Sequence, residues 1–147
     1  MSTLADLATR LSPGMFREAA VRAANKAGAL AVARTRMRMS GRVLNRRSGN
    51  LWNSVGYNVK ASNQDVTALV YGGGPTAPYL KAHEFGATIR PKKPGGLLRF
   101  EIGGEVFFAK KVVLPERPTI GPSVRETFKE LGTILSAEVH LQLRGEV

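Results

Sequence analysis

A histidine and a glutamate stand side by side at His83-Glu84, within the stretch PYLKAHEFGATIRPKKPGG that begins at residue 78. These two residue types could bind a metal ion or move a proton. Adjacent residues on a helix point about 100° apart, however, so the two side chains do not converge on one ligand. The second histidine of the chain, His140, is distant in sequence, and no H-E-x-x-H spacing occurs. We therefore expect no metal site and no cofactor. We interpret Glu84 as pairing with a nearby cation and His83 as half-buried.

Other catalytic chemistries lack the residues that they require. The chain contains no cysteine, which excludes disulfides, zinc–thiolate sites and cysteine nucleophiles. No G-x-S-x-G elbow is present, and the stretch GGGP (72–75) lacks the lysine and Ser/Thr of a phosphate-binding loop. Carboxylate catalysis needs two converging acids, whereas the acids here are spaced among basic neighbours. We predict that the protein is not an enzyme.

Positive charge is the stronger signal. The formal net charge is +11, and the first 60 residues hold most of this excess. The stretch RTRMRMSGRVLNRR (34–47) contains no acid, and its arginines are the predicted polyanion face: Arg34, Arg36, Arg38, Arg42, Arg46 and Arg47. Arg34 and Arg38 share a helix face, and Arg36 lies to another side. Without interleaved aromatic residues or a groove-reading motif, contact with nucleic acid would be to its backbone and sensitive to salt. An acidic protein surface is the alternative partner.

Length and composition indicate a single domain over residues 1–147 with a modest core. No apolar run approaches the ~20 residues that span a bilayer, and the N-terminus lacks a hydrophobic signal core. We therefore expect a soluble protein that is made in the cytoplasm and has no membrane partner. Residues 1–12 are predicted to form an extended or separate short N-terminal arm, distinct from the rest of the domain.

A long N-terminal helix is predicted from Ser12-Pro13, a favourable capping pair, to about Met39, with Gly41 ending or interrupting it. Its apolar stripe consists of Phe16, Ala20, Ala23, Ala27 and Leu30. Ser48–Asn50 is predicted to be a turn. A β-hairpin follows, with alternating apolar residues on both sides of the polar stretch Ser62–Asp65: Val55, Tyr57, Val59, Ala61, Val66, Ala68 and Val70.

The second half of the chain is also predicted to contain both helices and strands. Residues 78–86 form two helical turns closed by Gly86, and residues 87–97 form an exposed loop. A second hairpin joins 98–102 to 106–114 through a tight Gly103-Gly104 turn, which places Phe100 opposite Phe107. A final helix begins near Pro122. Its apolar stripe is Val124, Phe128, Leu131, Leu135 and Val139, with Glu126, Glu130 and Glu138 on its other side.

The predicted fold class is α+β: a long N-terminal helix, an antiparallel sheet of two hairpins with a short intervening helix, and a C-terminal helix packed on the sheet. The buried set should include Trp52, Phe100, Phe107 and Phe128. Two apolar hairpins leave strand edges that need a cover, and head-to-tail oligomerisation is one such cover.

Three segments, taken in order, resemble a known family. They are RRSGNLWNSV (46–55), YLKAHEFGATIRPK (79–92) and LRFEIGGEVFFAKKVVLPERPTIGPSV (98–124). In this order and spacing they resemble the small tail-component, or virion-morphogenesis, proteins of tailed bacteriophages. The likeness covers roughly residues 15–140. Ser48-Gly49 stands where the family usually has Thr-Gly, a change that keeps a capping hydroxyl and the turn glycine.

The resemblance implies a structural role in the virion, at the neck or in tail completion. The protein would form a ring, a hexamer or alternatively a dodecamer, around the DNA channel. Its partners would be further copies of itself, neighbouring neck, terminator or tail-tube proteins, and the backbone of the phage DNA. In this interpretation HEFG positions a loop, IRPKKPGG forms a contact tip, and LPERP sets the C-terminal helix. The expected contact residues are Phe85, Arg90, Lys92, Lys93, Glu116 and Arg117.

Two alternatives remain open. A tail terminator that caps the tail tube would share the family resemblance. A free-standing, basic, sequence-neutral nucleic-acid-binding protein would explain the charge without a ring. It should be a monomer or dimer whose affinity for DNA falls steeply with salt.

Overall fold

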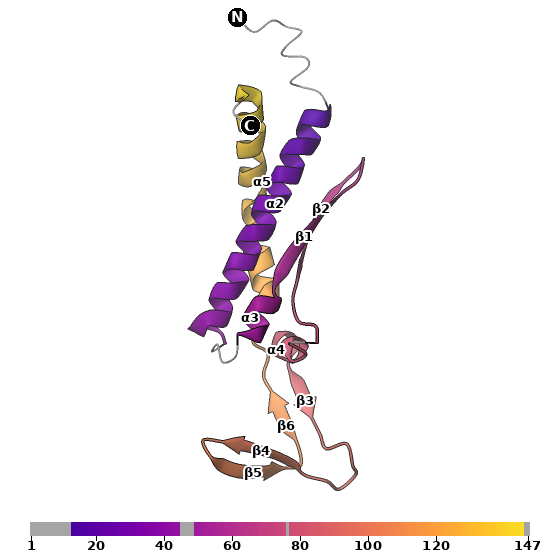
Figure 1. Cartoon of the computed structure of the whole chain (residues 1–147), viewed down its shortest axis with the longest axis vertical. Coiled ribbons are helices and arrows are strands. Elements are labelled where there is room, and N and C mark those ends of the chain that lie inside the picture. Colours follow the sequence, from indigo (N-terminus) through magenta and orange to yellow (C-terminus); the bar gives the residue numbers. More distant parts are fainter. Residues whose placement is uncertain (1–12, 45–48, 76, 146–147) are drawn as a thin grey trace, which may run out of the picture.

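The computed structural model describes residues 13–44, 49–75 and 77–145. Figure 1 shows an elongated molecule, with two long helices and a β-hairpin at one end and two short strand pairs at the other. The chain runs down the first helix, through the hairpin and the strand pairs, and back along the second helix. This arrangement confirms the predicted α+β plan.

Helix α2 (Pro13–Met37) contains the start that was predicted at Pro13, while Ser12 lies outside the described residues. It continues into a π-helical segment, η1 (Arg38–Arg42), whose backbone departs from helical geometry at Gly41 (φ 107°). The predicted interruption at Gly41 is therefore confirmed.

The apolar stripe predicted for α2 is only partly correct. Ala23 and Ala27 are buried, but Phe16 is 48% exposed. The reason is that α2 has two neighbours, α5 on one side and the β1–β2 hairpin on the other, and Phe16 and Ala20 line the groove between them. The buried face is Met15, Ala19, Ala23, Ala24, Ala27, Gly28, Ala31, Val32 and Thr35.

Strands β1 (Gly56–Ala61) and β2 (Val66–Tyr71) form the predicted antiparallel hairpin along α2. The hairpin approaches the helix closely at Gly28, where an added Cβ would lie 2.4 Å from Cδ2 of Tyr57. A glycine in a helix interior costs about 1 kcal/mol relative to alanine. Here its lack of a side chain leaves room for the Tyr57 ring against the helix.

The hydrophobic core lies where α2 ends and several short elements meet. Helix α3 (Asn50–Ser54) was not predicted, and Asn50 belongs to this helix rather than to a turn. Helix α4 (Leu80–Phe85) is the predicted two-turn helix, closed at Gly86. Both elements surround a core to which α2, η1 and the connecting segments also contribute: Val32, Met39, Leu44, Val55 and Leu80.

The far end of the molecule, which we call the arm (residues 87–114), contains the second predicted hairpin. Strands β4 (Leu98–Ile102) and β5 (Glu105–Ala109) pair through Gly103-Gly104. Both glycines have positive φ (62° and 88°), as a tight hairpin turn requires. Phe100 lies opposite Phe107 with stacked rings 6.0 Å apart, so this predicted pair is confirmed.

A second strand pair connects this hairpin to the rest of the molecule. Strand β3 (Ala87–Ile89) pairs with β6 (Val112–Leu114). Two predictions were therefore inaccurate: residues 87–89 belong to a strand rather than to a loop, and the return strand predicted over 106–114 is split. The physical reason is that the chain leaves β5 to pair with β3 instead. The strands that the structure describes form three separate two-stranded sheets.

Helix α5 (Ile120–Arg144) begins two residues before Pro122 and runs antiparallel to α2, as Figure 1 shows. It touches β2, but most of its contact is with α2. The predicted orientation of its faces was wrong. Glu138 is 2% exposed against α2, whereas Phe128 is 72% exposed. The face of α2 toward α5 offers cations, and the acidic face of α5 complements them.

The predicted set of buried aromatic residues was also largely wrong. Trp52 and Phe100 are partly buried, while Phe107 and Phe128 are exposed. Phe107 lies on a two-stranded sheet, and no other helix or strand of the described residues packs extensively on that sheet. Phe128 lies on a face of α5 that α2 leaves uncovered.

Candidate functional site

The His83-Glu84 pair has a structural role. One carboxylate oxygen of Glu84, Oε1, accepts hydrogen bonds from the backbone N–H of Thr119 (2.6 Å), the Thr119 hydroxyl (2.5 Å) and the backbone N–H of Ile120 (2.9 Å). Glu84 therefore caps the start of α5, where free N–H groups favour a negative charge. These groups occupy Oε1, and among the described residues Glu84 forms no ion pair, so the predicted cation partner is not found there.

His83 holds the same junction from its backbone. Its carbonyl accepts a hydrogen bond from the N–H of Arg117 (2.7 Å), and its ring lies edge-on to Tyr79 at 6.0 Å. His83 is half-buried, as predicted. The HEFG and LPERP segments are thus joined directly, and together they set where α5 begins.

The arginines predicted as a polyanion face separate into different environments. Arg34 and Arg38 point to α5, where they pair with Glu130 and Glu126. Arg36 lies on another side, as predicted: its guanidinium is 4.4 Å from the centre of the Trp52 ring and donates to the Val55 carbonyl (3.0 Å). Arg42 is exposed, and Arg46 and Arg47 lie outside the described residues. Two members of the predicted face therefore already have acidic partners within the chain.

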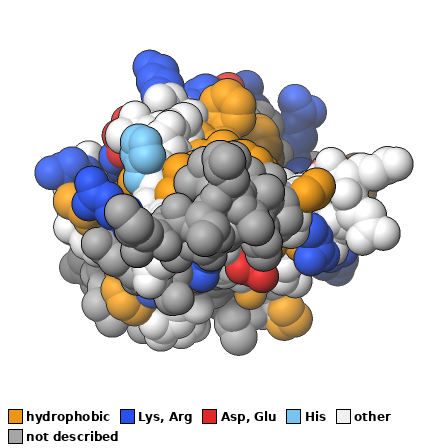
Figure 2. All heavy atoms as spheres, turned by 90° about the horizontal axis from the view of Figure 1, so that it is seen from above, with side chains coloured by type: hydrophobic (Ala, Val, Ile, Leu, Met, Phe, Trp, Pro, Cys, Tyr) orange, Lys and Arg blue, Asp and Glu red, His pale blue; other side chains and the backbone are white. Residues whose placement is uncertain are grey.

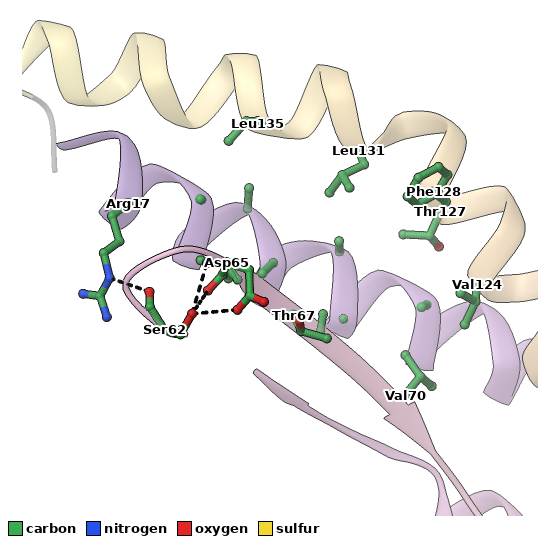
Figure 3. A pocket seen from close by; sticks show the side chains of 18 of the residues that line it. Arg17, Ser62, Asp65, Thr67, Val70, Val124, Thr127, Phe128, Leu131 and Leu135 are labelled. Carbon is green, nitrogen blue, oxygen red and sulfur yellow. Dashed lines mark hydrogen bonds between the residues drawn. The ribbon is translucent and has the colours of Figure 1, made fainter. Parts of the chain in front are cut away.

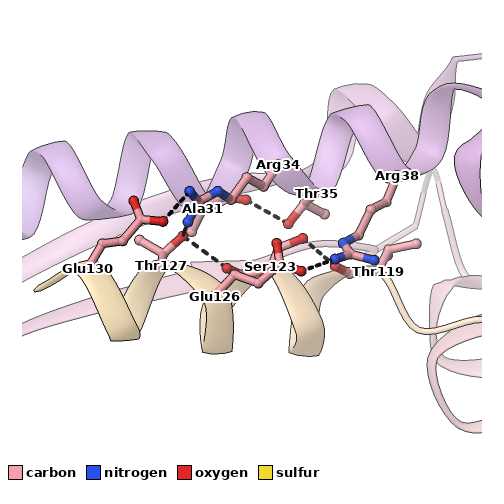
Figure 4. A network of polar contacts seen from close by, with 9 residues as sticks. All are labelled: Ala31, Arg34, Thr35, Arg38, Thr119, Ser123, Glu126, Thr127 and Glu130. Carbon is pink, nitrogen blue, oxygen red and sulfur yellow. Dashed lines mark hydrogen bonds and ion pairs between the residues drawn. The ribbon is translucent and has the colours of Figure 1, made fainter.

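Figure 4 shows that these contacts belong to a series of ion pairs along the α2–α5 interface, which we call the ladder. Arg34 pairs with Glu130 at 2.7 Å, and Arg38 pairs with Glu126. Nearer the chain termini, Lys26 pairs with the buried Glu138. The basic positions increase along α2 as the acidic positions decrease along α5, which is the register of two antiparallel helices.

Small side chains fill the interface beside the ladder. The hydroxyls of Thr35, Ser123 and Thr127 are buried and donate to the carbonyls of Ala31, Thr119 and Ser123, at 2.8, 2.7 and 2.9 Å. Each hydroxyl is satisfied within its own helix, so burial leaves no unpaired donor. With alanine on the facing positions of α2, these side chains allow the helices to approach closely.

An open groove lies between α5, α2 and β2, with a volume of about 610 Å³. Its floor is the alanine face of α2, and Figure 3 shows the α5 side chains that project over it: Val124, Phe128, Leu131 and Leu135. One end is closed by the hairpin loop, where Nε of Arg17 donates to the Ser62 carbonyl (3.2 Å). The lining is predominantly apolar and open to solvent.

Sequence reasoning missed the groove because it assigned the apolar stripe of α5 to the core. A signal for the correct arrangement was present. One set of basic residues on α2 and η1 occurs at positions 22, 26, 34 and 38, and the acids of α5 occur at 126, 130 and 138. Read in opposite directions, these spacings match. A helix that directs its acids to α2 must leave its other apolar stripe facing elsewhere.

The arm presents a second uncovered apolar surface. The β4–β5 hairpin has exposed apolar side chains on both faces: Ile102 and Phe107 on one, and Val106 and Phe108 (62% exposed) on the other. The residues predicted from the resemblance as partner contacts are all exposed in or next to the arm: Phe85, Arg90, Lys92, Lys93, Glu116 and Arg117. Their contact role remains a prediction.

Positive charge is distributed over the surface that Figure 2 presents, the end of the molecule near the start of α2. Lysine and arginine side chains lie around its circumference, with hydrophobic side chains between them. Within the described ranges, no group of three or more His, Asp or Glu side chains is placed to hold a metal ion. The helices that the structure describes do not combine the length and apolarity needed to cross a membrane.

Comparison with known proteins gives no match: no protein-family model, no curated protein and no solved structure matches this chain. Any functional assignment therefore depends on the residues and surfaces described above.

Proposed function

We propose that this chain is a structural protein of a tailed-phage virion. It acts at the head–tail junction, in the neck or in tail completion, as one subunit of a ring around the DNA channel. The observation that carries the proposal is the pair of apolar surfaces that a single copy leaves uncovered. One is the groove of the body, by which we mean the described residues outside the arm, and the other is the β4–β5 hairpin of the arm. Exposed apolar patches of this kind mark interaction sites.

The arm supports an assembly role on physical grounds. An isolated two-stranded hairpin is marginally stable in water at best, and its unpaired edges can join another chain. β4 and β5 pair only with each other among the described strands. A subunit whose arm is completed by a neighbour would meet both requirements.

The three segments that carry the phage resemblance also converge in space. Glu84 of the second segment caps α5 at Thr119 in the third. Val55, at the end of the first, packs in the same core as Leu80 of the second. Segments that are far apart in the sequence thus build one junction between body and arm. This supports the interpretation that the residues of the phage resemblance serve to position the arm.

The basic residues would face DNA or an acidic neighbouring ring, and two observations weigh on this choice. Arg34 and Arg38 are held by acids of the same chain. Arg42 is exposed and is not one of the residues of the ladder. We infer contact through a few exposed cations rather than a continuous basic stripe. This inference favours the ring protein over a free-standing nucleic-acid-binding protein. A tail terminator remains the alternative within the same family.

The decisive experiment removes the protein from the phage that encodes it. Particles assembled without it should accumulate as filled heads and finished tails that do not unite, as imaged by electron microscopy. Wild-type protein supplied from a plasmid should restore joining. Normal infectious particles in its absence would overturn the proposal, and tails of abnormal length would favour the terminator.

A measurement on the purified protein separates the nucleic-acid alternative. Binding to a short DNA duplex is followed as salt rises from 50 to about 200 mM. A protein that neutralises six to ten phosphates loses roughly 10³–10⁵ in affinity over this range. We expect weak binding to free DNA. Tight, strongly salt-dependent binding by a monomer or dimer would support the alternative.

A further inference from the structure

We propose that the groove of one copy receives the β4–β5 hairpin of a neighbouring copy, so that subunits join head to tail. The inference deepens the proposed function and rests on it for the closure of the ring. It assigns the two uncovered surfaces of the chain to each other, with a second copy as the occupant of the groove.

The groove suits a strand or hairpin with a narrow apolar face. Its floor is alanine, its α5 wall presents Leu131 and Phe128, and its opposite wall is β2. Among the described strands, β2 pairs only with β1, so its other edge has backbone N–H and C=O groups without strand partners. Added strands bind such edges through backbone hydrogen bonds while their side chains fill neighbouring pockets.

The hairpin has the matching face. Alternation along paired strands places one mostly apolar set on a single side, with Glu105 at its turn end: Leu98, Phe100, Ile102, Phe107 and Ala109. The stacked Phe100 and Phe107 form the centre of this face. Rigid aromatic side chains that enter a pocket are typical anchors of protein interfaces.

The hairpin cannot fill the groove of its own chain. Figure 1 places β4 and β5 at one end of the molecule, whereas the elements that line the groove, α2, α5 and β2, lie toward the other. The occupant must therefore come from another copy. Because the two surfaces differ, the contact is heterologous, and repetition of such a contact produces either a closed ring or an open filament.

Charge supports the same pairing. The hairpin is one of the few acidic parts of a chain with net charge +11, since it carries Glu101 and Glu105 against Arg99. The groove lining contains Arg17 and one acid, Asp65, and two further cations, Arg125 and Lys129, are exposed next to the groove residues Val124 and Phe128 in sequence. Acidic hairpin ends would meet basic groove margins, which favours the head-to-tail orientation over hairpin-to-hairpin contact.

The test uses two complementary variants. Phe107→Asp damages the hairpin and leaves the groove intact, and Phe128→Asp does the reverse. Both side chains are exposed in one copy, so circular dichroism should show folded proteins. Loss of an aromatic anchor should weaken self-association at least about 30-fold. Because each variant keeps one intact surface, an equimolar mixture should form 1:1 dimers and nothing larger, as measured by sedimentation.

Covalent trapping makes the test decisive if association is weak. The chain has no cysteine, so Phe107→Cys and Phe128→Cys on separate copies are unique thiols. A short thiol cross-linker should join them at least ten times more efficiently than it joins Phe128→Cys to the control Val113→Cys. Val113 is more exposed than Phe107 (61% against 41%) but lies on β6, outside both surfaces.

The possible outcomes are distinct. Dimers in the mixture and selective cross-linking support the inference. It is overturned if Phe107→Asp associates as the wild type does, or if no cross-link forms at high concentration. It is also overturned if deletion of residues 1–12 changes self-association and the two aspartate variants do not, because those residues would then be the occupant of the groove. If the head-to-tail contact is found but removal of the protein leaves phage particles normal, the proposed function is refuted and the contact stands. If removal of the protein prevents head–tail joining but no contact is found, the contact is refuted and the proposed function stands.

Discussion

In the body, α2 and α5 cover each other with alanine, small hydroxyl side chains and the ion-pair ladder, and the remaining apolar side chains meet in the core around Val55 and Leu80. In the arm, four short strands pair two by two and leave Phe107, Phe108 and Ile102 exposed. The body therefore contains most of its own stabilising contacts, whereas the arm has strand pairing but little burial. The difference indicates a folded platform that carries a surface for assembly.

The two regions also differ in how electrostatics is used. Acids of α5 are matched to bases of α2 along the body, and Glu84 is matched to the free N–H groups at the start of α5. In the arm, the exposed Lys92 and Lys93 lie between Pro91 and Pro94 and are not part of the ladder. The body uses charge to fix its own register. The arm holds charge that is available to a partner.

The largest expected effect comes from truncating the core. Leu80 is buried among Val55 and Ile120, so Leu80→Ala should lower the free energy of unfolding by about 2–5 kcal/mol. The matched arm variant, Phe108→Ala, removes more atoms from an exposed position and should change it by less than about 0.5 kcal/mol. Urea unfolding followed by circular dichroism measures both. Equal losses would contradict the contrast between body and arm.

A second test compares two glycines in helix interiors. An alanine at Gly28 gains about 1 kcal/mol of helix propensity, but its Cβ would lie 2.4 Å from Tyr57 Cδ2, and overpacking costs about 1–3 kcal/mol. Gly28→Ala should therefore lower the thermal midpoint. At Gly132 an added Cβ meets nothing within 4 Å, so Gly132→Ala should raise the midpoint. The same sign at both positions would show that the Tyr57 contact is unimportant.

The Glu84 cap has the next largest effect. Glu84→Ala leaves the N–H groups of Thr119 and Ile120 without this acceptor and should cost about 1–2 kcal/mol. Glu84→Gln keeps an acceptor oxygen and should lose less. Hydrogen exchange at the start of α5 should accelerate in the alanine variant and far less in the glutamine variant. Identical exchange in both would mean that the side-chain oxygen does not hold the helix start.

The smallest effect belongs to the ladder. Arg34 and Glu130 are partly exposed, and pairs of this kind contribute about 0.2–1 kcal/mol. A double-mutant cycle with Arg34→Ala and Glu130→Ala should give a coupling in this range that shrinks as salt rises. Arg42→Ala, outside the ladder, is the control and should show no coupling to Glu130. A coupling that is independent of salt would argue against an ion-pair contribution.

Local patterns determined much of the fold. Pro13 marks the beginning of α2 within the described residues, Gly41 interrupts the helix, and Gly103-Gly104 closes a hairpin that sets Phe100 against Phe107. These features depend on backbone preferences and on short-range periodicity, which neighbouring residues specify. The missed helix α3 is only five residues long, too short for a periodic signal.

Partner choice could not be obtained in the same way. The sequence by itself specified that α5 has an apolar stripe at Val124, Phe128 and Leu131 and acids on another side. It did not specify which stripe would meet α2. Only the tertiary structure decided this, because the cations of α2 and its closely packed alanines accept the acidic face, and one helix cannot bury two faces against a single partner. The apolar face that was left over became the wall of the groove.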